Sequence, residues 1–177
     1  NIKNDMVNGV KNFVAEQRKL PGQCLLTLIQ FDTVAYDTVF SGTPIADIPV
    51  IQLVPRGGTP LLDAIGRAIN ETGDRLQKLQ EEDRPEFVIV LIITDGEENS
   101  SHEFTKAKIK EMVGLQANLY KWNFTYLGAN QDAFTEAQSM GIDVASALQY
   151  KANSQGTMRM FDSVNYAATN LRSHSAH

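Results

Sequence analysis

Three polar segments of this sequence contain the residue types that could do chemistry. Residues 57–59 read Gly-Gly-Thr, residues 94–101 read Thr-Asp-Gly-Glu-Glu-Asn-Ser-Ser, and residues 128–132 read Gly-Ala-Asn-Gln-Asp. The hydroxyl of Thr59 and the carboxylate of Asp95 are oxygen ligands of the kind that a hard cation such as Mg²⁺ prefers, with water in the remaining positions. These residue types point to a divalent-cation site if the fold brings the segments together.

Two apolar segments predict the strands that would position these residues. Residues 87–94 are almost wholly apolar and mostly β-branched, which predicts a strand buried on both faces in the middle of a parallel sheet. Asp95 follows at its carboxyl end, the edge where open α/β sheets bind ligands. Residues 122–127 alternate, with aromatic side chains on one face that we expect to pack in the core rather than stack on nucleobases.

The remaining pattern alternates strands with helices, which predicts a mostly parallel sheet covered on both faces. Further strands are expected at 24–31, 33–40 and 142–148, and helices from the first residues to Pro21, then at 60–79, 103–118, 131–140 and 154–171. The strands 24–31 and 33–40 are joined tightly at Asp32, so they should pair antiparallel. We expect a single domain over 1–172 and a frayed tail over 173–177.

Bulk composition argues against several classes of function. The chain has 177 residues and a net charge of −5, so it lacks the basic excess of a general phosphate-backbone binder. No apolar run approaches the roughly 18 residues of a membrane span. The single cysteine, Cys24, rules out an internal disulfide and favours a cytoplasmic location. The three histidines lack zinc spacing and no nucleophile motif is present, so we expect a protein that is not an enzyme.

The polar segments also carry a family resemblance. Residues 57–65 (Gly-Gly-Thr-Pro-Leu-Leu-Asp-Ala-Ile), followed 36 residues after Thr59 by Asp95 within 93–96 (Ile-Thr-Asp-Gly), resemble a von Willebrand factor A (vWA) domain, and more narrowly the stand-alone bacterial proteins of that family. Gln-Phe-Asp at 30–32 and Leu-Gly-Ala-Asn at 127–130 fit the same order of elements. The resemblance covers essentially the whole chain. It implies a three-layer, Rossmann-like fold: a mostly parallel central sheet with one antiparallel edge strand and helices on both faces.

The family carries a metal-ion-dependent adhesion site, in which a divalent cation bridges the domain to an acidic side chain of a protein partner. The resemblance implies Thr59 and Asp95 as metal ligands and Mg²⁺, or Mn²⁺ or Ca²⁺, as the ion. The residues that it places behind these ligands or against the partner are Asp32, Gly58, Gly96, Glu97 and Asn130. The implied function is therefore recognition of a protein partner, with no role for nucleic acid or membrane.

One element of the family pattern is absent. The Asp-x-Ser-x-Ser motif that supplies the other ligands does not occur here, and neither does the first strand that precedes it. In the family that strand lies beside the central one, so its absence predicts a gap with unpaired backbone groups and exposed strand edges. We expect a longer natural protein, or a segment or another chain that fills the gap, and weak or no metal binding by these residues alone.

Several of these residues have simpler structural roles open to them. Thr59, like Ser100 or Ser101, could simply cap a helix, and Asn130 with Asp132 could do the same. Glu97 and Glu98 are expected to be solvated loop charges, while Asp32 supports the site or merely ends a strand. The alternative functions are a metal-assisted hydrolase that uses Asp95 with Glu97 or Glu98, and a degenerate vWA domain used only for assembly, with a strand donated from elsewhere.

Overall fold

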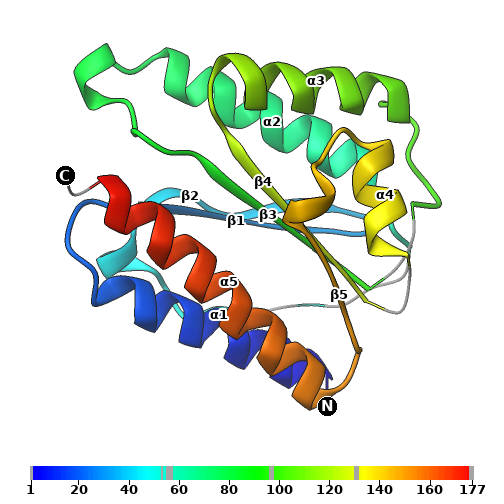
Figure 1. The fold of residues 1–177 in the computed structure, drawn as a ribbon, viewed down its shortest axis with the longest axis horizontal. Helices are drawn as coiled ribbons and strands as arrows, with labels where there is room; N and C mark the ends of the chain where they lie inside the picture. The colour runs from blue at the N-terminus through cyan, green and yellow to red at the C-terminus, as the bar shows by residue number, and fades with distance from the viewer. Residues whose placement is uncertain (1, 53, 55–57, 96–97, 130–131, 176–177) are drawn as a thin grey trace. The chain divides into compact units, whose positions relative to one another are not determined.

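A computed structural model of the chain describes residues 2–52, 54, 58–95, 98–129 and 132–175. It is a mixed α/β structure (Figure 1). Its contacts divide the chain into two compact units: the first comprises Asn1–Gly57 with Tyr150–His177, and the second comprises Gly58–Gln149. Within the described residues, no helix combines the length and the apolar character needed to cross a bilayer.

Two parallel helices, α1 (Ile2–Arg18) and α5 (Ser154–Ser175), lie side by side in the first unit (Figure 1). At their starts the Ser154 hydroxyl donates to the Asp5 carboxylate at 2.7 Å, and near their ends Arg172 donates to the buried side chain of Gln17 at 3.0 Å. The segment 173–177 is predicted to fray, but α5 continues to Ser175. In this last turn the Ser173 hydroxyl donates to the carbonyl oxygen of Thr169 at 2.8 Å.

The first unit also contains a two-stranded sheet, β1 (Leu25–Phe31) and β2 (Tyr36–Pro44). The strands pair antiparallel, which confirms the predicted hairpin. A carboxylate oxygen of Asp32 accepts hydrogen bonds from the backbone N–H groups of Val34 at 2.7 Å and Ala35 at 2.8 Å. Asp32 therefore closes the turn, as the plainer of its two sequence interpretations expects. A single-turn helix, η1 (Ile45–Asp47), follows β2.

The second sheet joins β3 (Ile89–Thr94), β4 (Asn123–Ala129) and β5 (Ala147–Tyr150) in the order β3-β4-β5. β3 and β4 are parallel, as predicted. The position of β3 is a correction, since among the described strands it has a neighbour on one side and β4 is the central one. The burial follows this order, because much of β3 is only half-buried whereas the last four residues of β4 are all buried.

Three helices complete the second unit: α2 (Leu61–Gln77), α3 (Lys106–Leu119) and α4 (Ala133–Ser139). The short helices η2 (Glu81–Asp83) and η3 (Val144–Ser146) lie between longer elements, and η3 takes up part of the strand predicted at 142–148. In Figure 1, α2 and α3 lie on the same side of the β3–β4 pair. The aromatic residues of the strand region are buried, which confirms the predicted core: Trp122, Phe124 and Tyr126.

Gly66 of α2 allows close contact with Phe104, which precedes α3. A Cβ added at Gly66 would lie 2.7 Å from atoms of the Phe104 ring. We expect Gly66→Ala to lower the free energy of unfolding by about 1–3 kcal/mol through overpacking. Gly73 of the same helix is the matched control, because an added Cβ there meets no atom within 4 Å. Gly73→Ala should be neutral or stabilising by up to about 1 kcal/mol. Urea unfolding measures both, and equal effects would contradict the packing argument.

Candidate functional site

The predicted ligands occupy chain segments that flank α2 and β3. Thr94, the last residue of β3, lies opposite Gly128 of β4, so the two strands end at the same sheet edge. Asp95 is the exposed residue that follows β3, and Thr59 lies just before α2. Gly58, with a φ of 84°, adopts a left-handed conformation that favours glycine. Three of the other predicted site residues lie outside the described residues: Gly96, Glu97 and Asn130.

Thr59 and Asn99 are joined by two hydrogen bonds, of which one is between backbone groups and the other is accepted by the Asn99 side chain. The N–H of Thr59 donates to the side-chain oxygen of Asn99 at 3.0 Å, and the N–H of Asn99 donates to the carbonyl oxygen of Thr59 at 3.2 Å. The N-cap residue of α2 is Pro60, so the alternative that Thr59 is the helix cap is wrong. These two hydrogen bonds hold Thr59, which lies just before α2, against Asn99, which follows Asp95 by four residues.

Glu98 lies against the first turn of α2 and is half-buried rather than solvated. One carboxylate oxygen accepts from the N–H of Leu62 at 2.9 Å and the hydroxyl of Ser101 at 2.8 Å. The other accepts from the N–H groups of Ser100 at 3.1 Å and Ser101 at 2.6 Å. The Ser101 hydroxyl oxygen in turn accepts from the N–H of Asp63 at 3.0 Å. The expectation that Glu98 is a solvated loop charge is therefore wrong.

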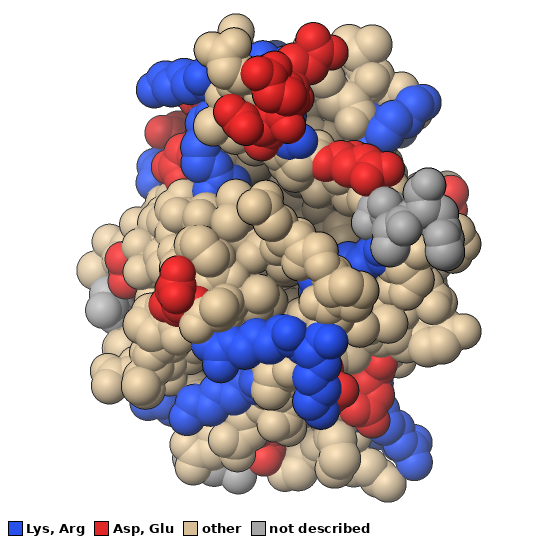
Figure 2. Space-filling model, turned by 90° about the vertical axis from the view of Figure 1, so that its left-hand side faces the viewer, with Lys and Arg blue, Asp and Glu red and all other residues tan. Residues whose placement is uncertain are grey.

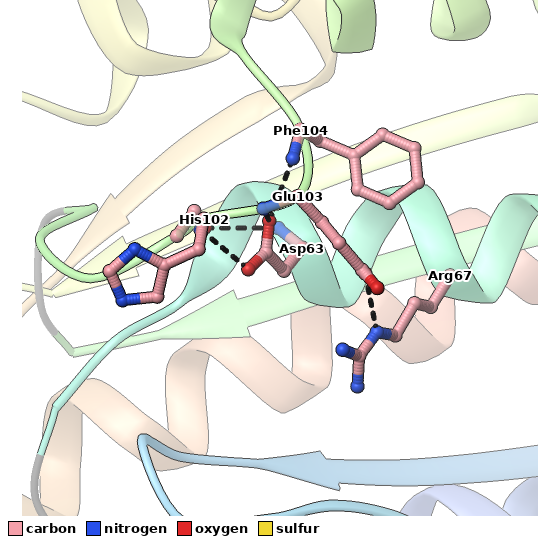
Figure 3. Close-up of polar contacts among 6 residues, drawn as sticks. Asp63, Arg67, His102, Glu103 and Phe104 are labelled. Carbon is pink, nitrogen blue, oxygen red and sulfur yellow. Dashed lines mark hydrogen bonds and ion pairs between the residues drawn. The ribbon is translucent and has the colours of Figure 1, made fainter.

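Asp63, in the first turn of α2, accepts hydrogen bonds from the backbone of the segment that contains Glu98 (Figure 3). Its carboxylate accepts three backbone hydrogen bonds, from His102 at 2.8 Å and from Glu103 and Phe104 at 2.9 Å each. Beside it, Arg67 donates to the Glu103 carboxylate at 2.7 Å. The Asp63 carboxylate thus holds residues 102–104 beside α2, with bends at 102 and 103.

These contacts explain where α3 begins. The N-cap of α3 is Thr105, whose hydroxyl accepts from the N–H of Lys108 at 3.1 Å, and the helix starts at Lys106. The prediction of a start at Glu103, with Ser100 or Ser101 as the cap, is therefore wrong. At the short helix the corresponding expectation for Asp132 is confirmed, since it accepts from the N–H of Thr135 at 3.1 Å.

We call the hydrogen bonds between residues 59–63 and 98–104 the α2 clamp. It leaves the start of α2 without a free donor. The N–H of Leu62 donates to the Glu98 carboxylate, and the N–H of Asp63 donates to the Ser101 hydroxyl. The N–H groups of Leu61 and Ala64 donate to the carbonyl oxygens of Thr59 and Pro60, respectively. A helix N-terminus binds phosphate through such donors, so this one is closed to that use. The Glu98 carboxylate also complements the positive end of the helix dipole.

The donor set fits a hard cation by type but is small. Thr59 and Asp95 offer two oxygen donors, and Mg²⁺ commonly takes one or two protein ligands and keeps several waters. The described part of the chain contains no group of three or more His, Cys, Asp or Glu residues arranged to hold a metal. Asp32 belongs to the first unit, where its carboxylate closes the β1–β2 turn. A cation at this site would therefore depend on water and on a partner for its remaining ligands.

Sequence patterns did not identify Glu98, Asn99 and Asp63 as a connected set. Local signals reach only a few residues along the chain, as in a capping box. The clamp joins residues that are 36 to 41 positions apart. The one available hint was an unusual density of short polar side chains directly after an apolar strand.

The clamp lowers the pKa of Asp63. Partial burial raises this pKa, but the hydrogen bonds from His102, Phe104 and Glu103 and the nearby Arg67 charge outweigh it, so the net pKa is below its usual value. The ionised Asp63 carboxylate therefore stabilises the folded state in full above its unfolded-state pKa of about 3.9. This contribution to the free energy of unfolding is lost as the pH falls through the lower folded-state pKa.

We expect Asp63→Asn to lower the free energy of unfolding at pH 7 by on the order of 2 kcal/mol, because a neutral amide replaces a charged acceptor. The difference from the wild type should shrink as the pH falls below about 4. Asp74→Asn, on an exposed position of the same helix, is the control and should change the free energy by no more than about 0.5 kcal/mol. Urea unfolding at several pH values provides the measurement; a pH-independent difference would count against the charged clamp.

Comparison with known proteins adds no family assignment, since no family model, curated protein or solved structure matches the chain. The vWA resemblance accordingly rests on the motifs of the sequence. What the structure contributes is a mixed α/β architecture, a parallel β3–β4 pair and a hydrogen-bonded contact between the two segments that carry Thr59 and Asp95.

Proposed function

We propose that this chain is a protein-binding module that recognises its partner through a divalent cation, Mg²⁺ or a similar ion, at a vWA-type adhesion site. Thr59 and Asp95 would hold the ion, and an acidic side chain of the partner would complete its coordination. The main support is the reciprocal pair of hydrogen bonds between Thr59 and Asn99. These bonds hold Thr59 against Asn99, and Asn99 follows Asp95 by four residues in the chain.

The chemistry of the site favours binding over catalysis. A hydrolase would need a nucleophile or a positioned base beside the ion. The best candidate among the described acids is Glu98, and both of its oxygens already accept hydrogen bonds in the α2 clamp. In the proposal Gly96, Glu97 and Asn130 contact the partner, and Gly58 gives the backbone its turn before Thr59.

The proposal extends to the fold and to the setting of the protein. It includes the three-layer fold of vWA domains, which the parallel β3–β4 pair supports, and a cytoplasmic location, which the single cysteine supports. The partner is a protein rather than a nucleic acid, because the chain carries a net charge of −5. Exposed carboxylates gather at η2, at the top of the view in Figure 2, and such a surface would repel a phosphate backbone.

Manganese titration tests the proposed site. The 177-residue chain should bind Mn²⁺ weakly, as followed by electron paramagnetic resonance of the free ion, and excess Mg²⁺ should displace it. Thr59→Ala and Asp95→Ala should each weaken binding by about tenfold or more, because each removes one of two protein ligands. Asp83→Ala removes an exposed carboxylate from η2 and should leave affinity unchanged. Equal binding by the wild type and Asp95→Ala would refute the site.

One observation favours assembly as a second candidate function. β3 is apolar up to Thr94, yet among the described strands it has a neighbour on one side. Such an edge can accept a strand from another chain. In that case light scattering after size-exclusion chromatography should show an oligomer. A well-folded wild-type monomer, without added peptide, would argue against assembly.

A further inference from the structure

We propose that the β1–β2 hairpin carries a second binding site, a groove that takes a lysine or arginine side chain from a segment of a partner protein. The groove has a volume of about 310 Å³ and is lined by residues of the hairpin and of the segment 50–54. All of these residues belong to the first unit, and neither Thr59 nor Asp95 is among them. The site therefore goes beyond the proposed adhesion site and needs no metal ion.

The groove lies between one face of the hairpin and the chain that follows η1. On the hairpin, Gln30 of β1 pairs with Asp37 of β2, and Val39 is two residues farther along β2, so the three side chains share a face. On the other side, residues 50, 52 and 54 line the groove, whereas Ile51 between them is 4% exposed and belongs to the core. This alternation makes the segment 50–54 the second wall of the groove.

The side chain of Gln30 holds this second wall in place. Its amide nitrogen donates to the carbonyl oxygen of Gln52 at 2.7 Å, and its amide oxygen accepts from the N–H of Val54 at 3.0 Å. The buried side chain of Ile51 anchors the same segment from the core side. Because both walls are fixed without a ligand, binding would not have to order them first, and such preorganisation favours affinity.

Two carboxylates give the groove its negative charge. Asp37 is exposed on β2, and its side chain has no hydrogen bond or ion pair with another described residue. Asp32 closes the β1–β2 turn, with one oxygen accepting the N–H groups of Val34 and Ala35. Among the described residues that line the groove, none is a lysine or an arginine. A cationic group of a partner would therefore complement the charge of this surface.

The apolar surface beside the two acids decides which kind of cation fits. Val50 is 79% exposed and Val54 is 56% exposed, and both line the groove. A small hydrated ion would leave these side chains in water. A lysine or arginine side chain can instead lay its methylene groups along them while its charged head reaches the carboxylates. The combination of acids and exposed valines thus favours a cation on an apolar stem.

A further exposed valine favours a protein segment over a free amine as the source of that cation. Val34 is 79% exposed and lies in the turn between Asp32 and Ala35, which both line the groove. An amine small enough to sit within the groove would leave this apolar surface uncovered. A peptide that inserts one basic side chain can also cover the rim with its neighbouring residues, as interfaces with a central anchor do.

A peptide array tests the site on the 177-residue chain. The peptides carry a fixed central residue (lysine, arginine, norleucine or glutamate) within the same set of varied flanking residues, and EDTA removes divalent cations. Lysine and arginine peptides should retain more of the chain than norleucine peptides, which keep the apolar stem but lack the charge, and glutamate peptides should retain least. Equal retention by lysine and norleucine peptides, or no retention by any of them, overturns the proposal.

Matched charge variants locate the binding, with the best lysine peptide of the array as the probe. Asp37→Asn should weaken its affinity by about three- to tenfold, an effect between those of fully exposed and buried ion pairs. Asp47→Asn removes the same charge from an exposed position of η1 outside the groove and should change the affinity by less than about twofold. Equal weakening by the two variants would mean that only the net charge matters and would overturn the groove.

A second pair of variants tests the apolar wall. Val50→Thr keeps the branched shape but replaces a methyl group by a hydroxyl, so it should weaken both lysine and norleucine peptides by about twofold or more. Val144→Thr makes the same change at an exposed residue of η3 in the second unit and should leave the affinity unchanged. Wild-type affinity in Val50→Thr would overturn the proposed groove.

Competition with n-butylammonium separates a protein segment from a free amine. This ion has the head and the stem of lysine without a peptide backbone, so it should displace the lysine peptide only at a concentration about a hundredfold higher or more. Displacement at the concentration of the peptide itself would identify the ligand as a free amine and overturn the assignment to a partner protein.

Discussion

The central constraint in the second unit is the need to satisfy the backbone N–H groups at the start of α2. A helix begins with donors that have no partner inside the helix, and those left buried without one are costly. Here the acceptors come from a distant part of the chain, through Glu98 and Ser101, and Asp63 accepts three N–H groups of that same segment in return. Each side of the contact supplies what the other lacks, so neither is fully satisfied alone.

This exchange determines several features that otherwise look unrelated. It holds residues 98–104 against the first turn of α2, so α3 begins only at Lys106, with Thr105 as its N-cap. It removes the N-terminus of α2 as an anion site, and it engages both oxygens of Glu98. Phe104 then packs on Gly66, one turn beyond Asp63, so apolar packing continues the same contact. The candidate cation site lies at the border of this structure rather than inside it.

The sheets raise a separate question of completeness. The described strands form a hairpin in the first unit and a three-stranded sheet in the second, with β3, an apolar strand by composition, at one of its two edges. Natural proteins commonly protect such edges with charge, a bulge or a covering element. The half-buried side chains of β3 show that its surroundings are only partly closed among the described residues. The proposed adhesion through an ion and the alternative of assembly through a strand would use different parts of this unit, and the two proposals are experimentally separable.

The sequence by itself determined the local elements. Apolar periodicity located the five longer helices and the β1–β2 hairpin, and alternation in residues 122–127 identified an aromatic core face, because these patterns depend on neighbours a few positions apart. It also identified Thr59 and Asp95 as candidate ligands through a family resemblance. Only the tertiary structure decided that Glu98 and Ser101 serve α2 and that β4 rather than β3 is central in the described sheet. These outcomes depend on hydrogen bonds between residues some 36 to 41 positions apart and on which strands become neighbours, and no local pattern encodes either.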